Sequence, residues 1–532
     1  MHTDKKFKDP IYGYIDVPSE YVDIIDSSQF QRLRRIAQTG YSPLFSSALH
    51  NRFVHSIGVF HLGRIAIDHL LENTEDHIKN ELTQKERYKK LFLLATLLHD
   101  VGHSPFSHTG ERYYLKNQSD YSELHNDLIS YVDDADLSRD IEQLDKTSYA
   151  NPHEIMSAII GISIYKDLFN SSNERAFFAR CITGYLYETD TYEKQILNCF
   201  IVLLNSDVID VDKLDYLLRD AYTTGFDTIK IDYERLLSAL KIVSYKNKLV
   251  LAYKKSAISV IENVIYARDA EKKWIQRHPV IMYECRLIEM IIEYISKITQ
   301  KGEDSLFSYK ALSVDGVSLA NNLNIRLLCD DDIVFLIKND KNSKLGDLLL
   351  NRKNRMHPLW KSEAEYNAVI MRNMSESAGD SFQSALSDIV ALFKDTSFDY
   401  IDESLLDYIL AEKERVEESK NQLSELTYKS QIATKERLIK LVRFLMSFAK
   451  EHGIEKRFMV IPSDSFNTGF DIKSFNNIVV DFGNNNISRL NGLFTSYEGS
   501  CDLSKRYYYI YYCRKDDIEV ASELCKGLCG LF

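Results

Sequence analysis

The amino-acid sequence predicts a mainly α-helical protein, and three observations support that fold class. Only 20 glycines and 8 prolines interrupt the 532 residues, so long helices can run without a break. Apolar residues recur at helical spacing in stretch after stretch of the first half of the chain. Strand-like runs are few: a predicted β-hairpin at 243–253 and three short runs after residue 456.

The predicted helices follow one another closely in the first half of the chain. They cover residues 22–40, 53–73, 88–103, 153–169 and 195–225. In the first helix, Asp26, Ser27 and Ser28 supply N-cap chemistry. The third helix contains LFLLATLL and is apolar on nearly every face, so we expect it at the centre of the fold.

The second half of the chain changes character near residues 400–450. This stretch predicts one or two long, highly charged amphipathic helices, of the kind that mediates contacts between subunits or lobes. The tail then alternates strand-like runs with a final short helix. We therefore expect a helical core with a small β-hairpin over 1–330, a helical extension over 331–455, and a smaller α+β C-terminal region over 456–532.

The composition is that of an ordinary globular chain, with 45% hydrophobic and 27% charged residues. Its net charge of -12 repels phosphate backbones, so single-stranded nucleic acid is a partner that we do not favour. No apolar run approaches the roughly 20 residues of a membrane span, so we expect no membrane partner. The N-terminal MHTDKKFKDPIYGYID lacks the layout of a signal peptide, and no CxxC pair occurs, which favours a cytoplasmic location.

Histidines are concentrated in one part of the chain. Ten of the 14 lie between residues 50 and 153, and three of them fall in HDVGHSPFSH at 99–108. Histidine is the residue best suited both to metal binding and to proton transfer near neutral pH. The concentration therefore indicates a functional site, although each histidine taken alone is equally explained as a packing or loop residue.

His99 and Asp100 stand at the end of the central apolar helix, where Gly102 supplies a break. At such a break, two neighbouring side chains can reach one cation. An imidazole and a carboxylate suit a divalent ion such as Fe, Mn, Zn or Co, but they fill only two positions. We expect the other ligands to be His55 and an aspartate of the run DVIDVDKLDYLLRD.

The same run offers a polar helix face. At helical spacing, Asp212, Tyr216, Arg219 and Asp220 lie on one side, while the leucines between them face the core. A polar face opposite an anchored apolar one is consistent with the wall of a pocket. A solvated face paired with neighbouring cations is the alternative.

The order of these motifs resembles the HD-domain superfamily of metal-dependent phosphohydrolases and, within it, the deoxynucleoside triphosphate triphosphohydrolases. The shared motifs are DPIYGYI, IIDSSQFQRLRRIAQTG, HNRFVHSIGV, LLHDVGHSPFSH, HE at 153–154 and DVDKLDYLLRD. They span about residues 8–225, with a weaker similarity to about residue 295. The resemblance implies that residues 1–330 form an HD-domain catalytic core.

The resemblance also implies a role for each matching residue. The metal ligands would be His55, His99, Asp100 and Asp212. The catalytic group would consist of His108 as general acid, Glu111 to orient it, and His153 beside the phosphates. The substrate-binding residues would be Gln38, Arg52, His103, Glu154, Lys213, Tyr216 and Asp220, with Arg52 and Lys213 on the phosphates and Gln38, Tyr216 and Asp220 on the deoxyribose.

The implied reaction is attack of water on the α-phosphorus of a dNTP, which gives a deoxynucleoside and inorganic triphosphate. The implied cofactors are one tightly bound divalent transition metal (Fe, Mn, Zn or Co) and Mg²⁺ that arrives with the triphosphate. The family also implies a homo-oligomer, a tetramer or hexamer, and a role in control of dNTP pools or in antiviral defence.

A nucleotide activator is a further implication of the resemblance. Lys5, Asp26 and Arg34 match residues that bind an activating nucleotide between subunits in some relatives. Lys8 departs from that pattern, where an asparagine is expected. The alternative, that Asp26 caps a helix and Arg34 is a surface cation, is equally open.

Two other functions stay in view. One is an HD-type nucleotidase or phosphodiesterase that acts on another nucleotide and releases monophosphate or orthophosphate. The other is a catalytically silent regulatory or nucleic-acid-binding protein, against which the complete set of four metal ligands argues.

Overall fold

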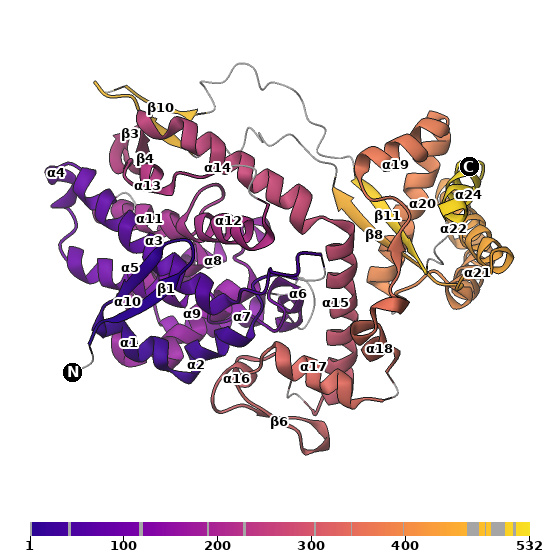
Figure 1. Cartoon of the computed structure of the whole chain (residues 1–532), viewed down its shortest axis with the longest axis horizontal. Coiled ribbons are helices and arrows are strands. Elements are labelled where there is room, and N and C mark those ends of the chain that lie inside the picture. Colours follow the sequence, from indigo (N-terminus) through magenta and orange to yellow (C-terminus); the bar gives the residue numbers. More distant parts are fainter. Residues whose placement is uncertain are drawn as a thin grey trace. The chain divides into compact units, whose positions relative to one another are not determined.

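The computed structural model describes residues 3–40, 44–115, 121–188, 191–226, 230–302, 305–341, 343–396, 398–464, 478–484, 486–490, 506–513 and 518–532. Helices dominate these residues and the sheets are small, so the prediction of a mainly α-helical fold is confirmed (Figure 1). The chain forms two compact units. The first contains the described residues of 1–272, 291–341 and 468–499, and the second those of 273–290, 342–467 and 500–532.

The first unit carries the histidine-rich segment and most of the helices. Its helices are α1 (Ser19–Asp26), α2 (Ser28–Gln31), α3 (Arg52–Asn73), α4 (Asp76–Lys79), α5 (Lys85–Leu98), α6 (His108–Glu111), α7 (Ser122–Val132), α8 (Ala135–Glu142), α9 (Pro152–Ile164), α10 (Ser172–Thr183), α11 (Tyr192–Leu204), α12 (Val211–Thr224), α13 (Tyr233–Leu237), α14 (Ile258–Glu271), α16 (Tyr309–Leu312) and α17 (Asp330–Asn339). Helix α15 (Pro279–Thr299) contributes residues to both units.

Helix α5 is the central helix that the sequence predicts. Every residue from Leu91 to Leu98 is buried, because the apolar side chains leave no polar face to turn toward solvent. Helix α3 packs against α5 and α12, and α10 packs against α5 and α9. These helices lie together in Figure 1, and their ends carry the residues of the candidate site.

Side-chain caps fix where the site-bearing helices begin. The Asn51 side chain accepts a hydrogen bond from the backbone of Val54 at the start of α3. At the start of α12, the Asp210 carboxylate accepts one from the backbone of Lys213. Each cap satisfies a backbone N–H that has no partner inside its helix.

The predicted helix at 22–40 differs from the observed structure. The chain forms α1, then α2, and then a 3₁₀-helix, η1 (Arg32–Arg35), instead of one continuous helix. Ser27 interrupts it with an extended backbone, and its side chain accepts from Phe30 as the N-cap of α2. The N-cap chemistry predicted for Asp26, Ser27 and Ser28 is thus supplied by Ser27, and not by Asp26.

Two hairpins belong to the first unit. Strands β1 (Lys5–Asp9) and β2 (Gly13–Val17) pair in an antiparallel hairpin that the sequence analysis did not predict. Strands β3 (Leu240–Tyr245) and β4 (Lys248–Lys254) form the predicted hairpin, with Val243 opposite Val250. Its turn residues, Lys246 and Asn247, both have positive φ, as a tight two-residue hairpin turn requires.

The rest of the β structure lies in small sheets. Strands β9 (Val479–Asp481) and β10 (Ile487–Arg489) extend the β3–β4 hairpin in the order β10-β9-β4-β3, with β4 and β9 parallel. Val243, Ala252 and Val479 form the apolar contact beneath that junction. Strands β5 (Val317–Ser318) and β6 (Asn324–Ile325) pair separately.

The second unit combines a helical hairpin with a three-stranded sheet. Its elements are α18 (Lys344–Leu350), β7 (His357–Pro358), α19 (Glu363–Val369), α20 (Glu376–Asp395), α21 (Glu403–Glu418), α22 (Glu425–Glu451), β8 (Phe458–Asp464), β11 (Arg506–Tyr512) and α24 (Ile518–Cys529). Helices α21 and α22 pack against each other, which agrees with the two long helices predicted for 400–450. The sheet has the antiparallel order β7-β11-β8.

The three-domain division at residues 330 and 455 stays a prediction, because compactness within one chain does not test which segments fold independently. Among the described residues, no helix combines the length and apolar character needed to cross a bilayer.

Candidate active site

Four side chains from three helix ends meet in the first unit. They are His55 in the first turns of α3, His99 and Asp100 directly after α5, and Asp212 in the first turn of α12. We call these residues the donor cluster. The His55 Nε2 atom lies 3.3 Å from His99 Nε2, 2.9 Å from an Asp212 oxygen and 3.6 Å from an Asp100 oxygen. The structure therefore brings the four predicted metal ligands together.

These distances fit one shared cation. Ligand atoms about 2.1 Å from a metal lie about 3.0 Å apart in an octahedron and about 3.4 Å apart in a tetrahedron. The donor–donor separations of 2.9–3.6 Å bracket both values. Two imidazoles and two carboxylates form a donor set that suits a divalent transition metal.

The tautomers of the two histidines also fit a metal. His55 Nδ1 donates to an Asp215 oxygen at 2.7 Å, and His99 Nδ1 donates to the carbonyl of Thr96 at 2.9 Å. Since both acceptors lack a proton to give, each Nδ1 carries a proton, so in the neutral ring that a metal requires the lone pair is on Nε2. Both lone pairs are then available to a metal between them.

The electrostatics favour positive charge at the same place. Burial lowers the pKa of His55, but hydrogen bonds to Asp212 and Asp215 and the charge of Asp100 raise it to about 10. Burial raises the pKa of Asp100, yet Arg52 and His99 hold it well below its ordinary value. A site that attracts protons so strongly also attracts a divalent cation, because both respond to the same buried carboxylates.

A chain of ion pairs behind the donor cluster holds His55 in place. Arg219 donates two hydrogen bonds of 2.9 Å to the Asp215 carboxylate and a third, also of 2.9 Å, to Asp9. The Tyr12 hydroxyl donates to Asp215 at 2.8 Å. Asp9 is the last residue of β1 and Tyr12 lies in the turn that follows, so this hairpin is linked to a donor of the cluster through four side chains.

Asp215 is a site residue that the sequence analysis missed. Its signal was present, since it lies three residues after Asp212 and four before Arg219 in DVDKLDYLLRD. The close approach of α12 to α3 depends on Gly58, since a Cβ there would stand 1.9 Å from an Asp215 oxygen.

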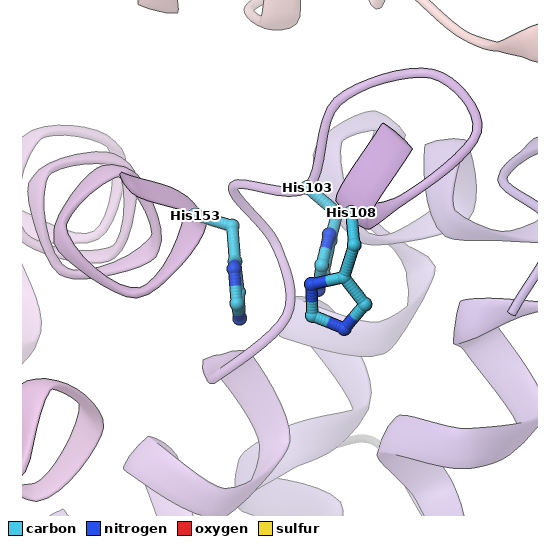
Figure 2. A group of neighbouring side chains, drawn as sticks. All are labelled: His103, His108 and His153. Atoms are coloured by element: carbon cyan, nitrogen blue, oxygen red, sulfur yellow. The ribbon is translucent and has the colours of Figure 1, made fainter. Parts of the chain in front are cut away.

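Three further histidines, His103, His108 and His153, lie close together (Figure 2), and His103 contacts Asp100 of the donor cluster. We call them the histidine cluster. The rings of His103 and His153 stack with centroids 3.9 Å apart and planes inclined by 17°, while His108 stands edge-on to both. Glu111 accepts hydrogen bonds from His153 Nδ1 and, at 3.1 Å, from His108 Nδ1.

The histidine cluster is not arranged for a metal of its own. Its nitrogen atoms lie within 4.8 Å of one another, close enough for a shared ion. A metal bound to imidazole, however, lies in the plane of the ring, and two stacked rings with nearly parallel planes cannot both point a lone pair at one ion. The cluster instead suits proton transfer and contact with an anion.

The protonation states within the histidine cluster differ. Burial lowers the pKa of His153, but Glu111 and the more distant acids raise it to about 9. Burial, Arg52 and His153 together lower the pKa of His103 well below its ordinary value. At neutral pH the cluster therefore holds a protonated His153 against a neutral His103.

The two clusters touch through Asp100. His103 Nε2 lies 3.1 Å from one Asp100 oxygen, and Arg52 donates to the other at 2.8 Å. Arg52 is buried, and its Nε also donates to the Ser107 hydroxyl at 3.0 Å. The predicted phosphate-binding arginine thus lies at the junction of the clusters, in contact with a carboxylate.

Two of the residues predicted to bind the sugar, Gln38 and Asp220, contact His50. The backbone N–H of Gln38 donates to the His50 carbonyl at 3.1 Å, and His50 Nε2 lies 2.7 Å from an Asp220 oxygen. Tyr216, one turn before Asp220 on α12, is half-buried, and burial raises the pKa of its hydroxyl. His50 was missed as a site residue, although it belongs to the histidine-rich segment.

Glu154 and Lys213 lie on the other side of the start of α12. Glu154 accepts from the backbone N–H of Asn151 at 2.6 Å in a capping box and from Asn205 at 3.0 Å. Lys213 donates to Asp210 at 2.8 Å. Both side chains line a cavity of about 1390 Å³ within the first unit.

The three predicted activator residues lie near the surface. The Lys5 amine pairs with Asp26 at 2.5 Å. The Arg34 guanidinium covers the Phe53 ring at 3.5 Å and donates to Gln31 at 2.9 Å. The structure brings Lys5 and Asp26 together, with the arginine stacked on a ring of α3.

Known proteins match parts of this chain, and the family model includes three of the four residues of the donor cluster. The model of the HD domain family matches residues 52–161. The deoxynucleoside triphosphate triphosphohydrolase SAMHD1 homolog of Dictyostelium discoideum is 33% identical over 242 residues, which are 45% of this chain and 40% of the relative. The corresponding SAMHD1 protein of Xenopus laevis is 26% identical over 358 residues, 66% of this chain and 55% of the relative. The chain spans about half the length of the curated relatives it matches.

A solved structure extends the similarity to the whole chain. A hypothetical protein from Aquifex aeolicus superposes with a TM-score of 0.54 and 21% identity, and the match covers 99% of this chain and 100% of that one. At this identity the likeness concerns the fold alone. Residues 52–161, which include His55, His99 and Asp100 of the donor cluster, match the model of the HD domain family.

Proposed function

We propose that the protein is a metal-dependent dNTP triphosphohydrolase. The observation that carries the proposal is the junction of the two clusters at Asp100, where a four-donor cation site adjoins histidines poised for proton transfer. The SAMHD1 names of two relatives give the substrate class. A divalent metal in the donor cluster supplies Lewis-acid chemistry, because it neutralises charge that develops on the attacked phosphate.

The side chains of the histidine cluster handle the leaving group in this proposal. Water attacks the α-phosphorus, and the bond from phosphorus to the sugar 5′-oxygen breaks. His108 gives its proton to that oxygen and the attacking water releases one proton to solvent, so that a neutral deoxynucleoside leaves and inorganic triphosphate remains. Glu111 supports this role because its hydrogen bond to His108 Nδ1 directs Nε2 away from the carboxylate.

The other predicted residues orient the substrate. Arg52 and Lys213 are cations for the phosphates, and the protonated His153 adds a third. Gln38, Tyr216 and Asp220 receive the deoxyribose. Arg52 and Lys213 each contact a carboxylate in the structure, so binding of a triphosphate with Mg²⁺ exchanges those contacts for phosphate oxygens.

Regulation and assembly follow as finer parts of the proposal. Lys5, Asp26 and Arg34 form the candidate site for a nucleotide activator. The neighbouring Lys5 and Asp26 support it, because together they offer a hydrogen-bond donor and an acceptor to a nucleotide base. We further propose that the protein forms a homo-oligomer, a tetramer or a hexamer. Its proposed role is in control of dNTP pools or in antiviral defence.

The test is an analysis of products. We expect the full chain, loaded with Mn²⁺ and supplied with Mg²⁺, to release inorganic triphosphate from at least one dNTP, offered alone or in a mixture of all four. Ion chromatography separates triphosphate from monophosphate and orthophosphate. Release of monophosphate or orthophosphate would refute a triphosphohydrolase and favour a nucleotidase or phosphodiesterase.

A matched pair of variants ties that activity to the donor cluster. Asp100→Ala removes a donor, so turnover should fall at least about 1,000-fold and bound transition metal should fall with it. Asp76→Ala removes an exposed carboxylate of the same unit and should change neither. Equal turnover in the two variants would contradict the assignment.

A further inference from the structure

The loop between the two clusters has an unusual backbone. Phe106 and Ser107 are consecutive non-glycine residues with φ of 57° and 54°, and Ser107 has ψ of -130°. L-residues rarely adopt these angles, and a chain keeps them only where surrounding contacts fix them. His108 follows directly as the first residue of α6, so its position depends on this strained pair.

Asp330 supplies the contacts that fix this backbone. It is the first residue of α17, more than 160 positions beyond the residues that match the HD-domain model. One of its carboxylate oxygens accepts the backbone N–H of Phe106 at 2.7 Å, and the other accepts the backbone N–H of Ala37 at 2.8 Å. Both oxygens of one side chain are thus used on two separate backbone segments of the site.

The contacts close into a ring. The Ser107 hydroxyl donates to the carbonyl of Ala37 at 2.5 Å and accepts from Arg52 Nε at 3.0 Å. Ala37 therefore makes two backbone hydrogen bonds, from its N–H to Asp330 and to its carbonyl from Ser107. Displacement of any one member would break hydrogen bonds on both sides of it.

A second set of hydrogen bonds links the same part of the chain to the loop. The buried Arg32 donates to the carbonyl of Leu328 at 2.8 Å and to the carbonyl of His103 at 2.7 Å. Residues 328–330 are therefore linked to both ends of the loop 103–108, to His103 through Arg32 and to Phe106 through Asp330. Asp330 holds the strained end, next to His108.

We propose that Asp330 is a positioning residue that fixes the loop 103–108 in the conformation that presents His108. Both oxygens of Asp330 accept from backbone N–H groups, so it acts through the backbone of Phe106 and Ala37. The consequence for catalysis rests on the proposed function, while the hold on the loop does not.

Hydrogen exchange tests the hold on the loop without any substrate. The full chain is compared as wild type, Asp330→Ala and Asp330→Asn by mass spectrometry of peptides covering 33–40 and 103–110. Asp330→Ala should speed exchange in both peptides about 10-fold or more, the factor expected when a backbone N–H loses its hydrogen-bond acceptor. Asp330→Asn keeps one acceptor oxygen and should speed exchange in one peptide more than in the other.

Asp331→Asn is the matched control. Asp331 is the next residue of α17, its side chain is exposed, and its contact with Arg35 is 3.5 Å long. This variant should exchange like the wild type in both peptides. If Asp330→Asn, shown to be folded by circular dichroism, exchanges like Asp331→Asn, the proposal is overturned.

Kinetics separate a positioning role from general loss of structure. With the best nucleotide substrate, Asp330→Asn should lower kcat about 10-fold or more and leave KM within about threefold, since proton delivery by His108 is disturbed. Bis(4-nitrophenyl) phosphate has a leaving group that needs no proton, so its hydrolysis should change by less than about threefold. An equal loss on both substrates would indicate a merely structural role and overturn the proposal. If the wild type cleaves no nucleotide, the proposed function fails, and the exchange experiment alone decides whether Asp330 holds the loop.

Discussion

Single side chains outside the donor cluster decide how its histidines can act. The Nδ1 atoms of His55 and His99 each contact an acceptor, a carboxylate in one case and a carbonyl in the other. Contacts of this kind fix the tautomer and the ring orientation of a metal ligand and raise its basicity. Asp215 is the stronger of the two acceptors, and the double hydrogen bond from Arg219 keeps it ionised and in place.

Replacement of Asp215 should therefore weaken metal binding. In Asp215→Asn the side chain loses the charge that supports His55, and we expect about 10- to 100-fold lower affinity for Mn²⁺ or Fe²⁺. Metal retained after dialysis against a chelator, measured by mass spectrometry, gives the readout without reference to activity. Asp16→Asn, which alters an exposed pair with Lys6, is the control. Equal retention in the two variants would show that Asp215 does not support the site.

The pair of His153 and Glu111 gives a prediction about pH. The pKa of His153 is about 9 in the folded protein, above the ordinary value of 6.5. A histidine with a raised pKa adds stability that is fully present below pH 6.5 and is lost as the pH rises through 9. Glu111 stays ionised throughout this interval because its pKa is lowered.

Thermal unfolding of Glu111→Gln against the wild type measures this effect. The difference in Tm should be largest near pH 6 and should shrink steadily between pH 6.5 and 9, because the wild type loses the charged pair there. Glu86→Gln removes an exposed acid in the first turn of α5 and should give a small difference that does not change with pH. A difference for Glu111→Gln that stays constant or grows toward pH 9 would contradict the pairing.

At the scale of elements, the donor cluster depends on the close packing of α12 against α3, which brings Asp212 and Asp215 to His55. Gly58 leaves the space in which Asp215 and Arg219 lie against α3, within reach of His55 three residues earlier. A Cβ at this position would stand 1.9 Å from an Asp215 oxygen and 2.5 Å from an Arg219 nitrogen. Movement of either group would break hydrogen bonds, because both belong to the chain of ion pairs behind the donor cluster.

Gly58→Ala should consequently destabilise the protein although alanine is the better helix former. We expect a loss of about 1–3 kcal/mol from overpacking, together with lower metal retention. Gly379→Ala is the matched control within α20, where the nearest atom is the terminal methyl of Met371 at 2.9 Å and can swing aside. Calorimetry and metal analysis of both variants provide the comparison. A Gly58→Ala protein as stable as Gly379→Ala would show that the helices can separate without cost.

At the scale of the whole molecule, the strands after residue 456 do not form one sheet. The segment with β9 and β10 joins the β3–β4 hairpin, where Lys241 pairs with Asp481 at 2.7 Å. Strands β8 and β11 pair with each other, with Tyr509 opposite Ile461. The sequence indicates β8, β9 and β11 by their β-branched and aromatic residues, and it did not predict β10. Alternation within a strand carries no information about the strand's partner.

The sequence by itself determined the helical class, the β3–β4 hairpin, the buried course of α5 and the residue types of the site. These features depend on spacing along a few turns of chain or on a single tight turn, so local pattern is sufficient to reveal them. It also indicated four metal ligands, a prediction with which the convergence of His55, His99, Asp100 and Asp212 agrees.

Only the tertiary structure decided which residues support that site. His55 and Asp215 are 160 positions apart, Tyr12 and Asp215 are 203 apart, and Phe106 and Asp330 are 224 apart. A hydrogen bond between such distant residues leaves no periodic trace in the sequence, because it is set by how the helices pack and not by the turns of any one helix. For that reason, the residues that line the site were readable in the motifs, whereas the residues that hold it in shape were not.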